Sequence, residues 1–455
     1  MPYEGERAKH IALQRIVNSK TVRSFLTRCA KRPSEPIESR IQRQVVPASD
    51  RNDLPRFVLA VDGSYHPVPI DTGFPELEIG FLSVATVLLN VDLIRTQGDE
   101  RIPDPVQVGL TTTSDSVEFA LPGGNVHMAG VNDPKHAFRR EFYDALSRMP
   151  LEREGESLLD TYHALLAHKS AAAGEMCPYD AECESRDRSL PRGEGEYTCP
   201  CPRGQPLYGT DALRIHEAFN PSRSSGEAYG EAMQVVEHLT IINFLRTLEV
   251  KDWLDSLEHI AIVLDGPLGV FGHPAWMKDA IQKELQRINH LVVAQTGRDM
   301  LMLGIEKTGK FMEHLVQLDT NRTGSPGELP CQSAMLLRDD YIKRYIAPSA
   351  SDRPYGSQTY FGRKFLYKTE SGARIVAMTP YLEDQHADLS VAELDQFPRI
   401  ADAVALLDLL VSTRYPDAVI PIVEAHAEAA IARGVGTRVL QRLAQELMNG
   451  PGGQQ

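Results

Sequence analysis

Two aspartates, each followed by a glycine, end two short apolar segments of the chain. Asp62 follows residues 57–61, and Asp265 follows residues 260–264. Segments this short and apolar are typical of strands buried on both faces, and a glycine permits the chain to turn sharply. A carboxylate at the end of a buried strand is costly unless a cation neutralises it. If the two strands are neighbours, the aspartates begin a divalent-metal site; the alternative is two Asp-Gly turns or helix caps.

A third carboxylate is expected on a long helix over residues 226–248. This segment is apolar on nearly all sides, as buried helices are. Glu237 falls among its apolar residues and therefore needs a partner, which a metal shared with Asp62 and Asp265 would supply. Glu231 is the alternative ligand, and a salt bridge to an arginine is the other interpretation. Three carboxylates favour Mn²⁺ or Mg²⁺, which suit phosphodiester hydrolysis because they orient the phosphate and activate water.

Three further side chains could assist such chemistry. His426 lies in a terminal helix of small residues and could donate a proton or bind the metal, unless it is an ordinary surface or core histidine. Tyr415 lies just upstream of that helix. Lys307 follows a buried strand and could neutralise a phosphate; the alternative is a solvated loop lysine.

Charge is distributed unevenly along the 455 residues, whose formal net charge is -14. Residues 1–50 carry ten basic and five acidic side chains, so a basic arm precedes an acidic body. Residues 8–30 have helical spacing, and the prolines of residues 31–55 predict a linker. The apolar stripe of the arm comprises Ile11, Ile16, Val22 and Leu26. The arm is expected to contact DNA or an acidic partner, or else to be a solvated helix.

Residues 171–210 are expected to interrupt the second domain, residues 51–455, as an insertion. They are rich in glycine, proline and charge, and they contain Cys177, Cys183, Cys199 and Cys201. No segment is apolar enough to span a membrane and no signal peptide is evident, which predicts a cytoplasmic protein. The clustered cysteines of residues 171–210 favour structural zinc over disulfides, although their spacing is looser than that of two C-x2-C knuckles. Unliganded thiols are the alternative.

The order of elements predicts an α/β fold. The expected strands are residues 57–62, 79–91, 106–110, 260–264, 291–305 with a break at Gly297, 361–367 and 373–379. The other expected helices are residues 135–170, 399–412, 421–433 and 436–448. Strand, meander, helix and second aspartate-ending strand follow one another as in an RNase H-like mixed sheet flanked by helices. In that sheet the first and fourth strands are adjacent, which would bring Asp62 and Asp265 together.

Several of these motifs together resemble the NurA family of nucleases. The motifs are Val61-Asp62-Gly63-Ser64, Val263-Leu264-Asp265-Gly266-Pro267-Leu268, Gly304-Ile305-Glu306-Lys307-Thr308, Tyr415-Pro416, and Ala425-His426 with Ile431. The resemblance spans most of the chain and implies an RNase H-like, homodimeric, manganese-dependent nuclease. It also implies a HerA-like hexameric ATPase as partner in the processing of DNA ends, for repair or antiphage defence.

The resemblance assigns metal-ligand roles to Asp62 and Asp265, and active-site roles to Tyr415 and His426. Glu237 is assigned from its helix and not from the resemblance. Two other readings of the sequence remain. One is a catalytically inactive RNase H-like module that docks onto DNA or an ATPase. The other is a phosphatase or ATPase on an actin-like sheet, against which the lack of a phosphate-binding glycine loop near Asp62 counts.

Overall fold

The structure is a computed structural model in which two units are distinguished, Met1–Gln42 and Arg43–Gln455. The residues that it describes are 10–29, 46, 53–71, 77–97, 112–131, 133–149, 155–169, 177–179, 194–320, 329–412, 415–432 and 434–449. The expected strand over residues 106–110 and Cys183 lie outside this set. Within the described residues, no helix is long and apolar enough to cross a membrane.

The first unit contains two short helices, α1 (His10–Asn18) and α2 (Lys20–Arg28). Ser19 separates them and caps α2, because its side chain accepts a hydrogen bond from the Val22 N–H. Five large apolar side chains of this unit are between 56% and 61% exposed; they are Leu13, Ile16, Val17, Phe25 and Leu26.

The second unit is built on an eight-stranded sheet with the order β3-β2-β1-β6-β7-β10-β9-β8. In that order the strands are Thr112–Pro122, Leu77–Asn90, Phe57–Asp71, Ile260–Asp265, Leu301–Glu306, Arg374–Pro380, Gly362–Lys368 and Ser333–Leu336. Strands β1, β6 and β7 run parallel, and the other pairs are antiparallel. The fourth strand of this sheet in chain order, β6, pairs with the first, β1, so the predicted adjacency is confirmed.

Helices cover both faces of the sheet. They are α3 (Val91–Gln97), α5 (Pro134–Arg148), α6 (Leu158–Leu166), α7 (Gly226–Val250), α8 (Met277–Thr296), α9 (Lys310–Asp319), α10 (Asp339–Tyr341), α11 (Ile400–Leu410), α12 (Ile420–Ala429) and α13 (Val435–Asn449). Short helical turns are η4 (Gly209–Leu213), η5 (Ile215–Glu217), η6 (Leu254–Glu258), η7 (His273–Trp276), η8 (Ile342–Ile346), η9 (Asp384–Ala387) and η10 (Leu394–Gln396). The predicted α/β class with a mixed, helix-flanked sheet is confirmed.

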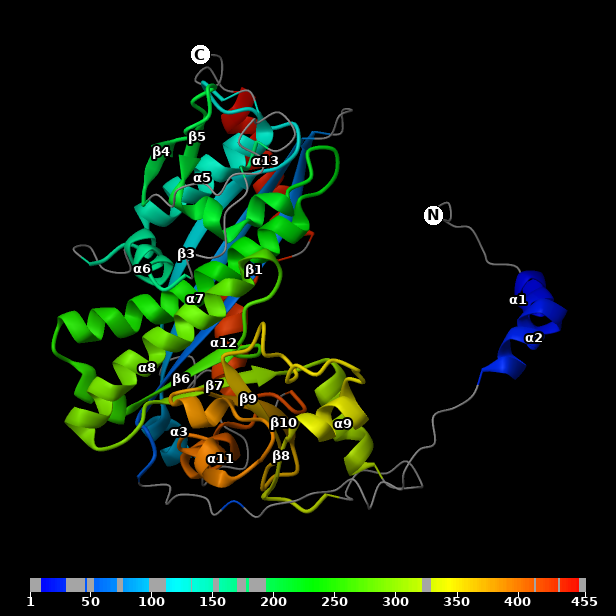
Figure 1. Ribbon diagram of the computed structural model, residues 1–455, viewed down its shortest axis with the longest axis vertical. Helices are drawn as coiled ribbons and strands as arrows, with labels where there is room; N and C mark the ends of the chain where they lie inside the picture. Colours follow the sequence, from blue (N-terminus) through cyan, green and yellow to red (C-terminus); the bar gives the residue numbers. More distant parts are fainter. Residues whose placement is uncertain are drawn as a thin grey trace. The chain divides into compact units, whose positions relative to one another are not determined.

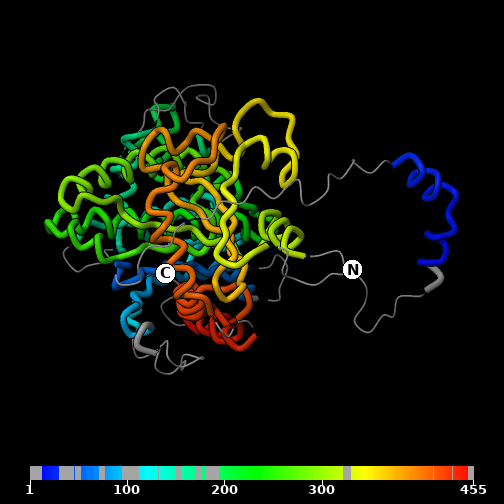
Figure 2. Tube along the Cα trace, turned by 90° about the horizontal axis from the view of Figure 1, so that it is seen from below, coloured from blue at the N-terminus to red at the C-terminus, as the bar shows by residue number. Residues whose placement is uncertain are grey.

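Two cores lie on opposite faces of the sheet, because successive strand residues point to opposite sides. Val61 and Leu264 belong to the core that contains α7 and α8. Val58 and Val263 belong to the core that contains α11 and the start of α12. Figure 1 shows α7 and α8 in green and the C-terminal helices in orange and red. Figure 2 shows the green and red helices on opposite sides of the blue strands.

One expected strand is wrong: residues 291–296 form the end of helix α8, and the strand begins only at Leu301. The run Leu291-Val292-Val293 suggested a strand because two of its residues are β-branched. In the structure only Val292 of the three is buried, while Leu291 and Val293 are each 38% exposed, as helical spacing requires. Gly297 ends the helix in a left-handed conformation, with φ of 76°.

Candidate metal centre

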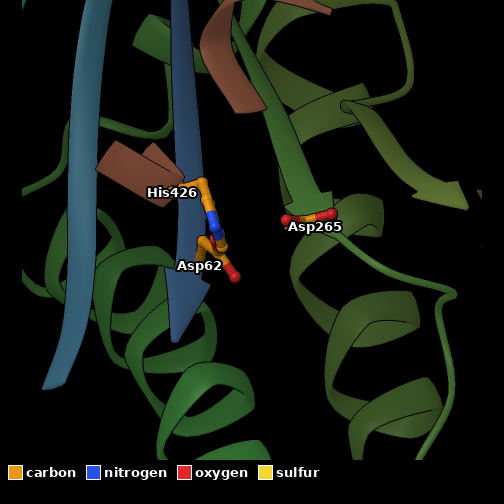
Figure 3. A group of neighbouring side chains, drawn as sticks. All are labelled: Asp62, Asp265 and His426. Carbon is orange, nitrogen blue, oxygen red and sulfur yellow. The ribbon is translucent and has the colours of Figure 1, made fainter. Parts of the chain in front are cut away.

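The pairing of β1 with β6 places two carboxylates side by side. Val61 pairs with Leu264, so Asp62 and Asp265 are the next residues on adjacent parallel strands. Asp62 lies two residues after Ala60 and Asp265 two residues after Val263, both of which face the α11–α12 side, so the two aspartates also point toward α12. Helix α12 supplies His426, and Figure 3 shows its imidazole directed at Asp62, with Asp265 at the end of the neighbouring strand. One ligand atom from each of these three residues lies within 4.8 Å of the other two.

Hydrogen bonds hold the three side chains in place. His426 Nδ1 donates to Asp62 Oδ2 at 2.8 Å, while Asp62 Oδ1 accepts from the Gly63 N–H at 2.8 Å. Lys307 Nζ donates to Asp265 Oδ2 at 2.6 Å. The side chains of Asp62 and Asp265 are 8% and 14% exposed, whereas that of His426 is 61% exposed. The carboxylates are thus recessed, and the imidazole lies between them and solvent.

The charge of Asp265 is destabilised by its surroundings. Burial and then repulsion by Asp62 raise the pKa of Asp265 from 3.8 to about 6, against the opposite effect of Lys307. A divalent cation between the carboxylates would replace this repulsion by attraction. Two carboxylate oxygens and an imidazole nitrogen form a donor set that fits a divalent ion such as Mn²⁺.

Glu237 lies beside this group without being one of its three members. It is buried on α7, and its Oε1 lies so close to Gly63 that a Cβ at that position would be 2.6 Å away. Burial, then repulsion by Asp62 and Asp265, raises the pKa of Glu237 well above its ordinary value, and the Gly63 N–H acts in the opposite direction. Glu237 is thus close enough to both aspartates to repel their charge. Its role as a metal ligand stays a prediction.

Two other candidates have different surroundings. Glu231, the alternative third ligand, is paired with His273, whose Nδ1 lies 3.0 Å from Glu231 Oε1. Tyr415 lies in the turn between α11 and α12 and is 43% exposed; its backbone N–H donates to Ser412 Oγ. Neither belongs to the group formed by the two aspartates and His426. A catalytic part for Tyr415 stays a prediction.

The pairing of Lys307 with Asp265 is a feature that the sequence did not indicate. Its position after a buried strand suggested only a phosphate contact. Because β6 and β7 are parallel neighbours, with Asp265 opposite Ile305, the residue two positions later reaches the carboxylate. The ammonium group therefore neutralises one member of the acidic pair in the absence of a metal.

The described cysteines of the insertion gather around a small hairpin, β4 (Glu196–Thr198) with β5 (Pro206–Tyr208). Cys177, Cys199 and Cys201 are all buried and pack together with Leu207. Burial raises the pKa of the Cys199 thiol to about 12. Among the described residues, only the group containing Asp62 has three ligand atoms mutually within 4.8 Å. Zinc binding by the cysteines of the insertion therefore stays a prediction.

Comparisons with known proteins give matches only among solved structures. The sequence has no significant match to a protein-family model or to a curated protein. The crystal structure of the NurA nuclease from Sulfolobus solfataricus aligns over 97% of this chain and 98% of its own, with 9% identity and a TM-score of 0.33.

Two further matches are to NurA structures. The crystal structure of NurA covers 97% of this chain and 96% of its own, with 11% identity and a TM-score of 0.28. The crystal structure of NurA with manganese covers 96% of this chain and 98% of its own, with 12% identity and a TM-score of 0.25. These are structures of the family that the sequence motifs resemble. Because TM-scores of this size reflect limited superposition, we infer function from the geometry of the site.

Proposed function

We propose that this protein is a metal-dependent nuclease that hydrolyses phosphodiester bonds of DNA. The observation that carries the proposal is the meeting of Asp62, Asp265 and His426 at the point where the parallel pairing of β1 with β6 ends. Paired carboxylates that repel each other need a cation, and an exposed imidazole beside them can transfer a proton. This combination suits hydrolysis of a phosphate ester.

Each residue has a distinct part in this proposal. Asp62 and Asp265 would hold Mn²⁺ or Mg²⁺, with Glu237 as the proposed third carboxylate. When bound, the metal supplies the positive charge that stabilises the phosphate as negative charge develops on it. Because His426 donates through Nδ1 to Asp62, its Nε2 is the nitrogen left to accept a proton from the attacking water. Lys307, which now donates to Asp265, would instead contact the phosphate once a metal neutralises that carboxylate.

Cleavage of linear DNA by the full-length protein, with and without Mn²⁺, tests the proposal. Asp62→Asn should abolish metal-dependent cleavage, and His426→Ala should slow it by roughly 10²- to 10⁴-fold near neutral pH, the usual worth of a general base. Asp417→Asn, which breaks an ion pair to Arg374, controls for the loss of an ordinary carboxylate. Wild-type cleavage rates in Asp62→Asn would show that the site is misassigned.

The runner-up is a catalytically inactive RNase H-like module that only docks onto DNA or an ATPase. Such a module would bind DNA and would not cleave it in the presence of any divalent metal ion. The adjacency of the three candidate ligands favours the enzyme, since a docking surface has no need of two carboxylates in mutual repulsion.

The resemblance to NurA also leads us to propose a HerA-like hexameric ATPase as partner and a homodimeric nuclease. A motor that delivers DNA ends would compensate for the acidic body, whose charge opposes binding to long duplexes. Co-sedimentation of the chain with such an ATPase and measurement of its mass in solution test the two parts separately.

A further inference from the structure

Tyr65 is an exposed aromatic residue three positions beyond Asp62 on the same strand, β1. It is 38% exposed, although β1 is otherwise largely covered. Its ring lies against helix α7 at Gly226 and Gly230. A Cβ at Gly230 would lie 3.4 Å from ring atom Cε1 and 3.5 Å from Cζ, and one at Gly226 would lie 4.0 Å from Cε2. The Tyr65 hydroxyl oxygen would also lie 3.5 Å from a Cβ at Gly230, so the hydroxyl end of the ring rests on two successive turns of the helix.

The two glycines make this position unusual. Residues four apart lie on the same side of a helix, so Gly226 and Gly230 form one surface without side chains. A glycine inside a helix makes the helix less stable than an alanine would, and Gly230 carries this cost. The two glycines leave room for the hydroxyl end of the Tyr65 ring, while the residue as a whole stays 38% exposed. Within the described residues, the Tyr65 hydroxyl has no hydrogen-bond partner, so a buried polar contact does not explain the residue.

The edge of β1 is open between Asp62 and Tyr65. The parallel pairing with β6 ends at Val61 and Leu264, and beyond it no described strand pairs with that side of β1. Asp62 and Tyr65 point to opposite faces of the strand, about 10 Å apart at the usual rise per residue. A polynucleotide chain can therefore cross this edge with a phosphate at the aspartates and a nearby base over the tyrosine ring.

We propose that Tyr65 is a stacking platform for an unpaired base next to the cleaved phosphate, so that the substrate is single-stranded nucleic acid or a frayed end. This inference rests on the proposed nuclease function. An aromatic face accepts any base, whereas the bases of an intact duplex are already stacked on their neighbours and cannot reach it. The alternative is that the ring merely covers α7, in which case any apolar side chain would serve.

Four variants of the full-length protein separate these explanations. Tyr65→Leu keeps apolar bulk on the glycine surface but removes the flat ring, and Tyr65→Trp keeps the ring. Tyr65→Ala removes both. Trp253→Ala is the control, because Trp253 is 55% exposed and lies beyond the other end of α7. The probe is a twelve-nucleotide single strand containing 2-aminopurine, with Ca²⁺ replacing Mn²⁺ for binding and Mn²⁺ used for cleavage.

We expect Tyr65→Leu and Tyr65→Ala to weaken single-strand binding and raise KM roughly tenfold, within the usual worth of one stacked base, with little change in kcat. Wild type and Tyr65→Trp should quench the 2-aminopurine, and Trp253→Ala should behave as wild type. Wild-type binding, KM and quenching in Tyr65→Leu would overturn the platform while leaving the nuclease intact, as would an equal loss on blunt duplex. Failure of the wild type to cleave either substrate would overturn both proposals.

Discussion

Replacing Asp265 by asparagine should stabilise the metal-free protein while removing its metal-dependent activity. Burial and repulsion from Asp62 raise the pKa of Asp265 from 3.8 to about 6. Below pH 3.8 the group is protonated in both the folded and unfolded states and exerts no effect. As the pH rises toward 6, the unfolded chain releases the proton while the folded chain retains it. Folding stability is therefore lost across this interval, and the penalty is complete above pH 6.

The size of the effect follows from the same values. One pKa unit corresponds to about 1.4 kcal/mol, so ionised Asp265 costs about 3 kcal/mol of folding free energy at pH 8. Asparagine cannot ionise and avoids this cost. This cost is already net of the favourable ion pair with Lys307, which acts on the same pKa. We expect a gain of about 3 kcal/mol at pH 8 that nearly disappears at pH 4.

Urea unfolding in the presence of a chelator, at pH 4 and pH 8, measures this gain. Asp319→Asn is a matched control, because Asp319 is also buried but accepts a hydrogen bond from Lys368 Nζ at 2.7 Å. Removing the charge of a carboxylate that is paired with a buried cation should destabilise the protein by a few kcal/mol. Addition of Mn²⁺ should raise the unfolding midpoint of the wild type and not that of Asp265→Asn.

Two results would refute this reasoning. If Asp265→Asn lowers the midpoint at pH 8 as Asp319→Asn does, Asp265 is stabilised by its ion pair and is not in net repulsion. If Mn²⁺ stabilises Asp265→Asn as much as the wild type, the metal binds elsewhere.

Three further variants test other parts of the structure. Gly63→Ala should destabilise the protein by roughly 1–3 kcal/mol in thermal unfolding, because its Cβ would lie 2.6 Å from Glu237 Oε1 and 2.8 Å from Met233 Cγ; an unchanged midpoint would contradict the close approach. The double variant Cys199→Ser, Cys201→Ser should lose about one zinc per chain by elemental analysis and retain DNA cleavage, whereas a wild type free of zinc would exclude the metal. Deletion of residues 1–42, which leaves buried Val46 in place, should weaken co-sedimentation with a HerA-like ATPase and spare oligonucleotide cleavage; unchanged co-sedimentation would place the docking surface elsewhere.

The parts of the fold that the sequence predicted are those with one dominant local signal. The apolar segments before Asp62 and Asp265 are typical of buried strands, and their order along the chain indicated that they are neighbours. Helix α7 was evident from its length and apolar composition. By contrast, residues 291–296 carry a local β signal that the packing of α8 overrides, because Ile288 and Val292 share one buried side of a helix.

The site was predictable to a similar degree. Its aspartates follow from strand order, but the contact between Asp62 and His426 joins residues 364 positions apart, and only the motif resemblance suggested it. No spacing rule predicts the contact of Glu237 with Gly63, which depends on how deeply α7 packs against β1. A signal for Tyr65 was present, because Gly226 and Gly230 lie four apart at the start of an otherwise strongly apolar helix.

The acidity of the centre has a consequence for the order in which it binds its ligands. Asp62 lies close enough to raise the proton affinity of both Asp265 and Glu237, and the Lys307 ammonium contacts Asp265 directly. A phosphate that approached this group without a metal would meet uncompensated negative charge, so the metal has to bind first. With Asp265 neutralised by a bound metal, Lys307 would be free to attract a phosphate to this acidic edge. The same metal that supports hydrolysis would thus also control access of the nucleic acid, in a chain whose overall charge of -14 otherwise repels it.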